Sequence, residues 1–180
     1  MPGVPLSVGA TNPKDGAVQY ESRRVDGLPL KIQASAGITE VPVGSVVSWQ
    51  EDTNGNQIVC TGAAAYTGNE YATFAVIGVG FLEAATQQNG NLNPTPGVLE
   101  EDDICAIVMD TNAVAMAPLD EGNEPTVGGS AYVTRAGLLS SSNTNAVAFP
   151  GEAFYGTPSV QLSGQLKTNY AFARLSRNTI

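Results

Sequence analysis

The most constraining feature of this 180-residue chain is a series of short apolar runs and polar turns between Ile104 and Leu139. The run Ile104–Met109 is followed by a turn, the run Ala113–Ala117 by an acidic loop containing Pro and Gly, and the last run spans Ser130–Leu139. Short apolar runs bounded by turn-forming residues are typical of β-strands. The pattern predicts a small β-barrel or sandwich with little room for a cleft, whose working part is its surface.

The composition favours the same fold class. Charged residues make up 14% of the chain, whereas about 25% is usual in soluble domains. The 20 Gly and 11 Pro residues favour turns and strands over helices. The length fits one domain with a sizeable core. We therefore predict an all-β protein: a single compact β-barrel or jelly-roll-like sandwich with an extended N-terminal arm.

The net charge of −9 limits the partners that the chain can bind. Its eight Lys and Arg residues form no basic cluster beyond the pair Arg23-Arg24, so we expect no nucleic-acid binding. An anionic membrane surface would repel the chain, and no apolar run is long enough for a membrane-spanning helix. Because the first residues lack the features of a signal peptide, we expect the chain to fold in a cytosol.

The chain divides into two parts by composition. Residues 1–28 are rich in Pro, Gly, Asn and Ser, and Pro2, Pro5 and Pro13 prevent a regular helix there. Two interpretations stay open for this segment: a disordered tail, or an extended arm that orders only against a neighbour. Residues 29–180 are expected to form the β-barrel domain.

Several strands of that domain are predicted individually. The dipeptide Asn54-Gly55 lies between two apolar runs and predicts a hairpin. The run Tyr71–Leu82 is apolar on both alternating faces and predicts a strand that is covered on both sides. A short helical turn is expected within Val98–Asp103. In the run Tyr170–Leu175, the residues Tyr170, Phe172 and Arg174 share one face.

The residues that usually carry chemistry are scarce. The absence of histidine excludes Ser-His-Asp and Cys-His catalysis and most zinc sites. Cys60 and Cys105 lie in apolar runs and are predicted to be buried thiols, although the sequence leaves a disulfide between them open. We therefore predict no enzymatic activity, no cofactor and no metal site.

Two acidic motifs resemble functional sites but fail on spacing. The residues from Asp52 to Asn56 suggest a calcium loop, but its positions six and twelve hold Gln57 and Ala63 instead of Gly and Glu. The run Glu100–Asp103 does not give the opposed carboxylate pair of a glycoside hydrolase. We expect it to be a solvated loop that protects the adjoining strand from edge pairing.

The remaining runs carry a resemblance to a known family. The strand and turn pattern of Ile104–Met109 and Ala113–Ala117, the Gly-x-x-Tyr-Val-Thr-x-x-Gly motif of Gly129–Gly137, and the closing Ala-x-Ala-Arg-Leu strand of Ala171–Leu175 resemble the capsid cement (head decoration) proteins of tailed bacteriophages. The resemblance covers roughly residues 44–177. It consists of strand and turn patterns and includes no catalytic signature.

The resemblance implies a structural virion protein on the outer surface of an icosahedral phage head. Such a protein joins neighbouring subunits of the major capsid protein, assembles as a dimer or trimer, and holds the expanded shell against the pressure of the DNA. It folds in the host cytoplasm and then joins the virion. We expect contacts to the capsid from residues 2–25 and from the polar loop at residues 87–97. The candidate contact residues for the capsid or a second subunit are Pro5, Arg23, Arg24, Trp49, Asn91, Leu92, Tyr170 and Arg174.

Two other functions stay open. A carbohydrate- or receptor-binding β-sandwich of a head or tail fibre would use Trp49 and tyrosines to stack on sugars. For Trp49, Tyr170 and Phe172, core packing competes with a role as interface anchors. A hydrolase that uses two carboxylates is the third possibility, but no motif in the chain places such a pair.

Overall fold

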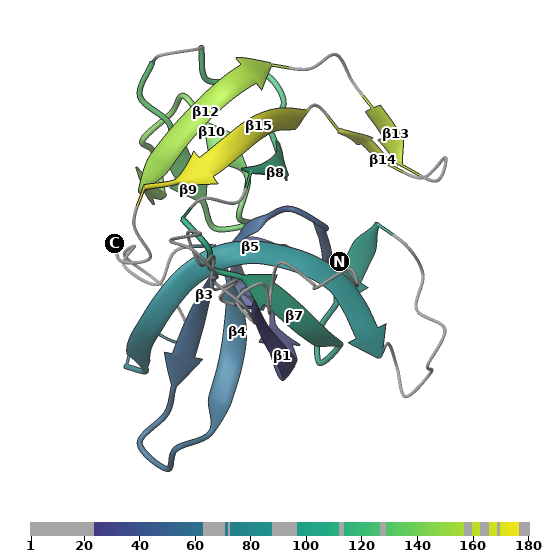
Figure 1. Ribbon diagram of the computed structural model, residues 1–180, viewed down its shortest axis with the longest axis vertical. Helices are drawn as coiled ribbons and strands as arrows, with labels where there is room; N and C mark the ends of the chain where they lie inside the picture. The colour runs from purple at the N-terminus through teal and green to yellow at the C-terminus, as the bar shows by residue number, and fades with distance from the viewer. Residues whose placement is uncertain are drawn as a thin grey trace, which may run out of the picture.

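The fold is all-β, as predicted, and its largest unit is a closed five-stranded barrel (Figure 1). The computed structural model describes residues 24–62, 71, 73–87, 97–111, 114–126, 129–156, 160–162, 166–168 and 170–176. The barrel has the strand order β1-β4-β3-β5-β7 and closes between β7 and β1. Its strands are β1 (Arg24–Lys31), β3 (Val46–Glu51), β4 (Gln57–Thr61), β5 (Ala75–Gln87) and β7 (Ile104–Val108).

The barrel interior is filled by alternate side chains of these strands, as the twofold period of a strand requires. Leu30, Val47 and Ile107 are fully buried there. The interior cluster consists of Leu28, Leu30, Ile32, Val41, Val47, Val59, Leu82, Leu99, Cys105, Ile107 and Met109. Both cysteines are buried and free, which confirms the prediction of buried thiols and answers the open question about a disulfide.

Strand β1 begins earlier than the sequence suggested. Residues 24–28, which the sequence assigned to the N-terminal arm, belong to the barrel because Arg24, Val25 and Asp26 pair with β7. The register shifts between Asp26 and Leu28, and Gly27 at the shift has φ 78°. A glycine bulge therefore lets a strand that contains Gly and Pro continue along its partner. The rest of the predicted arm, residues 1–23, lies outside the described residues.

Four small sheets complete the described part of the chain. One has the order β12-β15-β8, a second the order β10-β9-β11, and two are the pairs β13-β14 and β2-β6. The bounds of these strands are β2 (Glu40–Pro42), β6 (Val98–Glu100), β8 (Val114–Pro118), β9 (Tyr132–Thr134), β10 (Leu139–Ser140), β11 (Ala146–Ala148), β12 (Gly151–Gly156), β13 (Val160–Leu162), β14 (Leu166–Thr168) and β15 (Tyr170–Leu175). A 3₁₀ turn, η1 (Ala34–Ala36), follows β1. Figure 1 shows the β12-β15-β8 sheet above the barrel.

A second hydrophobic cluster joins the small sheets to the outside of the barrel. Val46, Val79 and Phe81 on the outer face of β3 and β5 pack against side chains of the small sheets. The rings of Phe81 and Phe149 lie 6.3 Å apart and are tilted by 54°. The other members of this cluster are Ala117, Leu119, Val133, Leu139, Ala171, Ala173 and Leu175. From Val79 to Leu82, β5 is therefore covered on both faces, as the apolar run Tyr71–Leu82 predicted. The prediction is wrong for Val76 and Ile77, which are 49% and 39% exposed.

The contact between the barrel and the small sheets depends on glycine. Gly44 has φ 89°, and a Cβ atom on it would run into the backbone carbonyl oxygen of Met116 on β8. Gly137 has φ 81° and lies in the same way against the carbonyl oxygen of Val46. At both places backbone packs on backbone, and any larger residue would push the two parts of the molecule apart.

Two local predictions have opposite outcomes. The Asn54-Gly55 hairpin is confirmed, since β3 and β4 pair in antiparallel register and Gly55 has φ 83°. Asp52 organises this turn, because its carboxylate accepts hydrogen bonds of 2.8 Å from the backbone N–H groups of Asn54 and Asn56. The helical turn expected within Val98–Asp103 is wrong: residues 98–100 form β6 and pair with β2.

Candidate interaction surface

The outer face of the β12-β15-β8 sheet is unusually apolar. The exposed fractions are 56% for Val114, 42% for Met116 and 38% for Phe172, and Met116 lies directly opposite Phe172 in the sheet. The residues between them point the other way: Ala117, Ala171 and Ala173 are buried in the second core cluster. Large apolar side chains therefore face outward and small ones inward, the reverse of the usual order in a half-buried strand.

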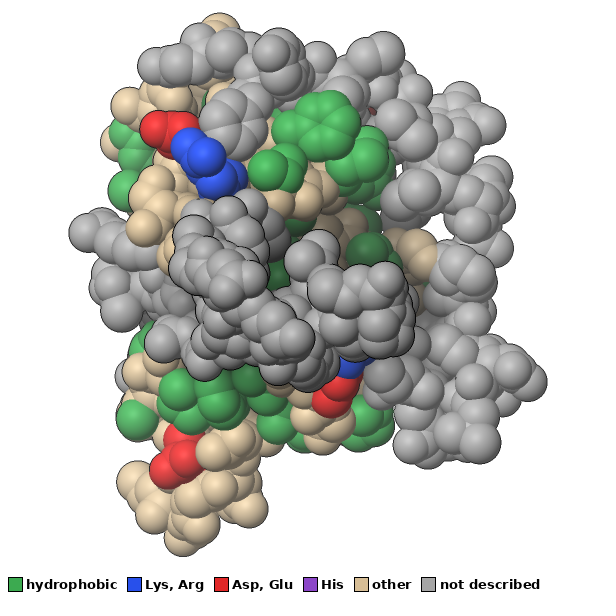
Figure 2. All heavy atoms as spheres, viewed as in Figure 1, with side chains coloured by type: hydrophobic (Ala, Val, Ile, Leu, Met, Phe, Trp, Pro, Cys, Tyr) green, Lys and Arg blue, Asp and Glu red, His purple; other side chains and the backbone are tan. Residues whose placement is uncertain are grey.

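An ion pair borders this apolar face. Arg174 on β15 lies opposite Glu152 on β12, and its guanidinium donates a hydrogen bond of 3.2 Å to the Glu152 carboxylate. Both side chains are about half exposed, so the pair adds little to stability. Figure 2 shows hydrophobic side chains beside basic and acidic side chains on the half of the molecule that holds the small sheets. Apolar surface with a charged rim is typical of protein interfaces.

An apolar groove lies between β8 and the barrel. Its volume is about 230 Å³, below the range of roughly 300–1,000 Å³ that is usual for small-molecule sites. The residues that line it are Val43, Gly44, Phe81, Leu82, Glu83, Val108, Val114, Ala115 and Met116. The sequence predicted little room for a cleft, but the turn after Val108 carries the chain from the barrel to a different sheet. The groove opens between the two strands that this turn connects.

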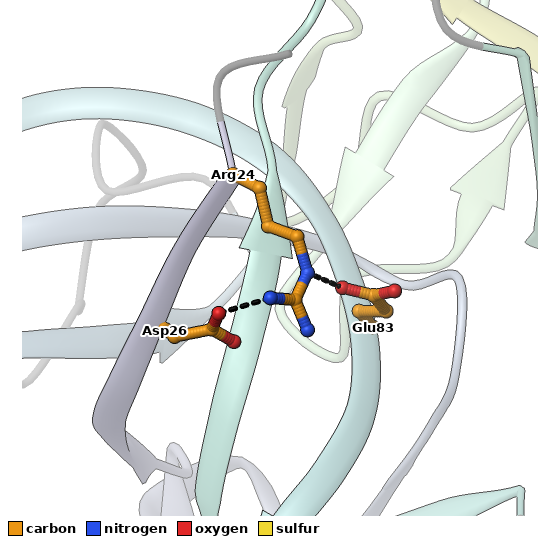
Figure 3. Close-up of polar contacts among 3 residues, drawn as sticks. All are labelled: Arg24, Asp26 and Glu83. Atoms are coloured by element: carbon orange, nitrogen blue, oxygen red, sulfur yellow. Dashed lines mark hydrogen bonds and ion pairs between the residues drawn. The ribbon is translucent and has the colours of Figure 1, made fainter. Parts of the chain in front are cut away.

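Arg24 contacts Glu83, one of the residues that line the groove (Figure 3). Its Nε donates a hydrogen bond of 2.5 Å to Glu83 Oε2 on β5, and its Nη1 forms an ion pair with Asp26 on β1. The hydrogen bond that Arg24 donates to Glu83 is the main reason why the pKa of Arg24 is raised above its usual value. Arg24, a candidate contact residue, is thus partly exposed but held by two carboxylates of its own chain.

The other candidate contact residues have separate environments. Arg174 lies on the exposed face described above. Trp49 is half-buried and packs against the barrel interior, and Tyr170 is only 2% exposed. For Trp49 and Tyr170, the core-packing interpretation therefore fits the structure. Pro5, Arg23, Asn91 and Leu92 lie outside the described residues, as does most of the loop at residues 87–97.

The sequence missed Val114, Met116, Glu152 and the groove residue Glu83. A signal for the first two was present, since Val-Ala-Met-Ala alternates large with small apolar residues. The backbone of β8 approaches the barrel closely at Gly44, and the small inward residue Ala117 is fully buried there, whereas Val114 and Met116 point outward.

A second depression lies beside the sheet β10-β9-β11. Its volume is about 340 Å³, and the residues that line it are Ala36, Ile38, Asp120, Thr134, Arg135, Ala136, Leu138, Thr144 and Asn145. These described lining residues include no aromatic ring, the usual platform on which sugars stack. The depression therefore adds no support to a carbohydrate-binding function.

The acidic run has both exposed and buried members. Glu101 and Asp102 are exposed and form ion pairs with Lys31, that of Glu101 at 3.4 Å. The prediction of a solvated loop is wrong for Asp103, which is only 1% exposed. Its carboxylate accepts a hydrogen bond of 2.7 Å from the backbone N–H of Glu100, which stabilises the turn before β7.

One buried thiol has a strongly shifted pKa. Burial, with smaller effects of Asp103 and Asp26, raises the pKa of the Cys105 thiol to about 12, so this thiol is a poor nucleophile at neutral pH. Among the residues that the structure describes, no group of three or more His, Cys, Asp or Glu side chains is placed to hold a metal ion. The same residues include no helix that is long and apolar enough to cross a membrane.

Comparisons of the chain with protein-family models, curated proteins and solved structures found no match.

Proposed function

We propose that this chain is a structural virion protein of the cement type, which binds the outer surface of an icosahedral phage head and bridges subunits of the major capsid protein. One observation carries the proposal: the sheet β12-β15-β8 directs Val114, Met116 and Phe172 to solvent and alanines to the core. Contiguous exposed apolar side chains mark interaction sites on soluble proteins. The strand and turn resemblance to cement proteins supplies the kind of partner.

The physical requirements of a cement protein fit this surface. A protein that is repeated many times on a shell and contacts two subunits gains from avidity, so that each single contact can be small. The apolar side chains around Phe172 would form the dry centre of such a contact, and the Arg174–Glu152 pair would lie at its hydrated rim. Self-association into a dimer or trimer would multiply these contacts.

The test uses heads that are assembled from the major capsid protein without this chain. Phe172→Glu places a charge in the centre of the proposed contact, and we expect its occupancy on the heads to fall at least about tenfold. Ile77→Glu is the matched control, because Ile77 has almost the same exposed fraction, 39%, but lies on β5 of the barrel. Occupancy is read from the protein bound to purified heads, and urea unfolding checks that both variants fold.

Equal occupancy of Phe172→Glu and the unchanged chain would refute the proposed contact. A fall for both variants would show that added charge on any face weakens binding, which also contradicts a specific surface. A cryo-EM reconstruction of the decorated heads would then locate the protein on the shell and count its copies.

The proposed contribution of the N-terminal segment needs a truncation that spares the barrel. Because Arg24 and Val25 pair with β7, the deletion should end before Arg24. We expect the chain without residues 1–22 to unfold at nearly the same urea concentration and to bind heads more weakly. Unchanged occupancy would refute a capsid contact by this segment.

A further inference from the structure

Two methionines in the described part of the chain have opposite environments. Met116 on β8 is 42% exposed, whereas Met109, which follows β7, is 4% exposed and packs in the barrel interior. The methionine side chain carries a thioether, which oxidants in solution attack where they can reach it. The fold therefore presents one of these two thioethers to solvent and buries the other.

The outward position of Met116 is fixed by the backbone of β8. The register with β15 places Met116 opposite Phe172, and the next residue, Ala117, is buried in the second core cluster. On the barrel side, the Met116 carbonyl oxygen lies so close to Gly44 that it would exclude a Cβ atom there. Because neighbouring residues of a strand alternate between its faces, the Met116 side chain cannot turn into the core without breaking this register.

The surroundings of the Met116 side chain are apolar. Val114 on the same strand and Phe172 on β15 are also exposed, and side chains directly opposite each other in an antiparallel pair lie about 4.5–5.5 Å apart. The charged residues Arg174 and Glu152 at the border of this face form an ion pair with each other. An oxygen atom on the Met116 sulfur would therefore place a polar group within the apolar face.

We propose that Met116 is a modification site for oxidants of the peroxide class, and that its reversible oxidation makes the apolar face of the β12-β15-β8 sheet polar. The thioether sulfur attacks one oxygen of hydrogen peroxide, so that a sulfur–oxygen bond forms and the oxygen–oxygen bond breaks. The departing hydroxide takes the proton of the transferred oxygen and leaves as water. Sulfur loses two electrons and peroxide gains them. Sulfoxide reductases, one for each sulfoxide epimer, return the product to methionine.

Oxidation at Met116 should change the face without unfolding the protein. The Met116 side chain already contacts water, so its sulfoxide oxygen stays hydrated, whereas an oxygen on Met109 would enter the barrel core. When a partner covers the face, this water leaves and the sulfoxide oxygen loses its hydrogen bonds, which weakens the contact. Only this effect on a partner rests on the proposed function, since the oxidation itself concerns the isolated protein.

The first test treats the isolated full chain with hydrogen peroxide. Asp110 lies between the two methionines in the sequence, so that cleavage at acidic residues places Met109 and Met116 on different peptides for mass spectrometry. We expect Met116 to gain one oxygen at least about tenfold faster than Met109. In urea the two rates should become equal, because the fold no longer protects either thioether. Equal rates in the folded chain would overturn the inference.

The second test measures the face by hydrophobic-interaction chromatography. The oxidised chain should elute earlier than the untreated chain, and treatment with both sulfoxide reductases should restore the retention. In Met116→Leu, which has no thioether at this position, peroxide should no longer change the retention. The matched control Met109→Leu should keep the change. A change that persists in Met116→Leu, or that is lost in Met109→Leu, would overturn the inference.

The third test measures the effect on a partner, with the heads used above. We expect peroxide to lower the occupancy of the unchanged chain at least about fivefold, and the reductases to restore it. Met116→Leu, compared with its own untreated sample, should show no such fall. Equal occupancy of the untreated and oxidised chains would overturn the effect on binding. If the untreated chain does not bind heads, the proposed function fails, and the first two tests decide the inference.

Discussion

The packing of the small sheets on the barrel can be tested at a single backbone position, Gly44. Its φ of 89° is strained for any residue with a side chain. A Cβ atom added to Gly44 would also lie only 2.0 Å from the carbonyl oxygen of Met116. The substitution Gly44→Ala therefore has two costs, one from the backbone conformation and one from the contact with β8. Gly55→Ala has only the first cost, because Gly55 has φ 83° and nothing lies within 4 Å of its added Cβ.

The two costs can be estimated separately. A left-handed conformation costs an alanine about 1–2 kcal/mol, and the stiffer unfolded chain returns about 0.4–1 kcal/mol. Gly55→Ala should thus lower the free energy of unfolding by roughly 1 kcal/mol. A steric contact with backbone that cannot rotate away adds about 1–3 kcal/mol, so Gly44→Ala should lose roughly 2–4 kcal/mol.

Urea unfolding followed by the emission of Trp49, the single tryptophan, measures both variants. We expect a lower midpoint for Gly44→Ala than for Gly55→Ala, and a difference in free energy of unfolding of at least about 1 kcal/mol. An equal loss in free energy of unfolding in the two variants would mean that β8 does not pack against Gly44. The described contact between the barrel and the small sheets would then be wrong.

Three further predictions concern single side chains. Because the Cys105 thiol keeps its proton up to a pKa of about 12, whereas an unfolded thiol loses it near 9, the free energy of unfolding should fall as pH rises above 9, by at most about 1.4 kcal/mol per unit. Urea titrations between pH 8 and 10 should show a shallower fall in Cys105→Ala. The hydrogen bonds that the side chain and backbone of Asn56 donate to Asp52 lower the pKa of Asp52 below 3.8. The contribution of the Asp52 carboxylate to stability should therefore persist above pH 3.8 and disappear as the pH falls through the lowered pKa. NMR titration of the carboxylate measures this pKa. Trp49→Phe should cost less than about 1.5 kcal/mol in thermal unfolding, because the buried Trp49 Nε1 has no hydrogen-bond partner among the described residues; a larger loss would contradict this.

The parts of the fold that the sequence predicts are those determined by neighbours in the chain. The Asn54-Gly55 hairpin needs only a turn with positive φ and two flanking apolar runs, and it forms as expected. The strand Tyr170–Leu175 also forms where the alternation placed it, with Phe172 and Arg174 exposed. Such elements depend on residues close together in the chain, so that a single sequence is enough to predict them.

The pairing of distant strands could not be predicted in the same way. β1 runs parallel to β4 and antiparallel to β7, and no local pattern distinguishes these partners from others. The strands β12 and β14 were not predicted at all, and residues 24–28 were assigned to the arm. Their strand conformation depends on hydrogen bonds to partners far away in the sequence, and such context regularly overrides local propensity.

The sequence did not reveal the apolar outer face of the β12-β15-β8 sheet. The run Ala113–Ala117 predicts a strand but does not show which of its side chains face outward, and large apolar side chains normally face inward. Here the backbone of β8 touches the barrel at Gly44, and the small inward residue Ala117 next to this contact is fully buried. A chain whose surface had no partner would lose nothing by placing polar residues at the outward positions, and it would gain solubility. That Val114, Met116 and Phe172 occupy them instead is the physical argument for the interaction surface that we propose on this face.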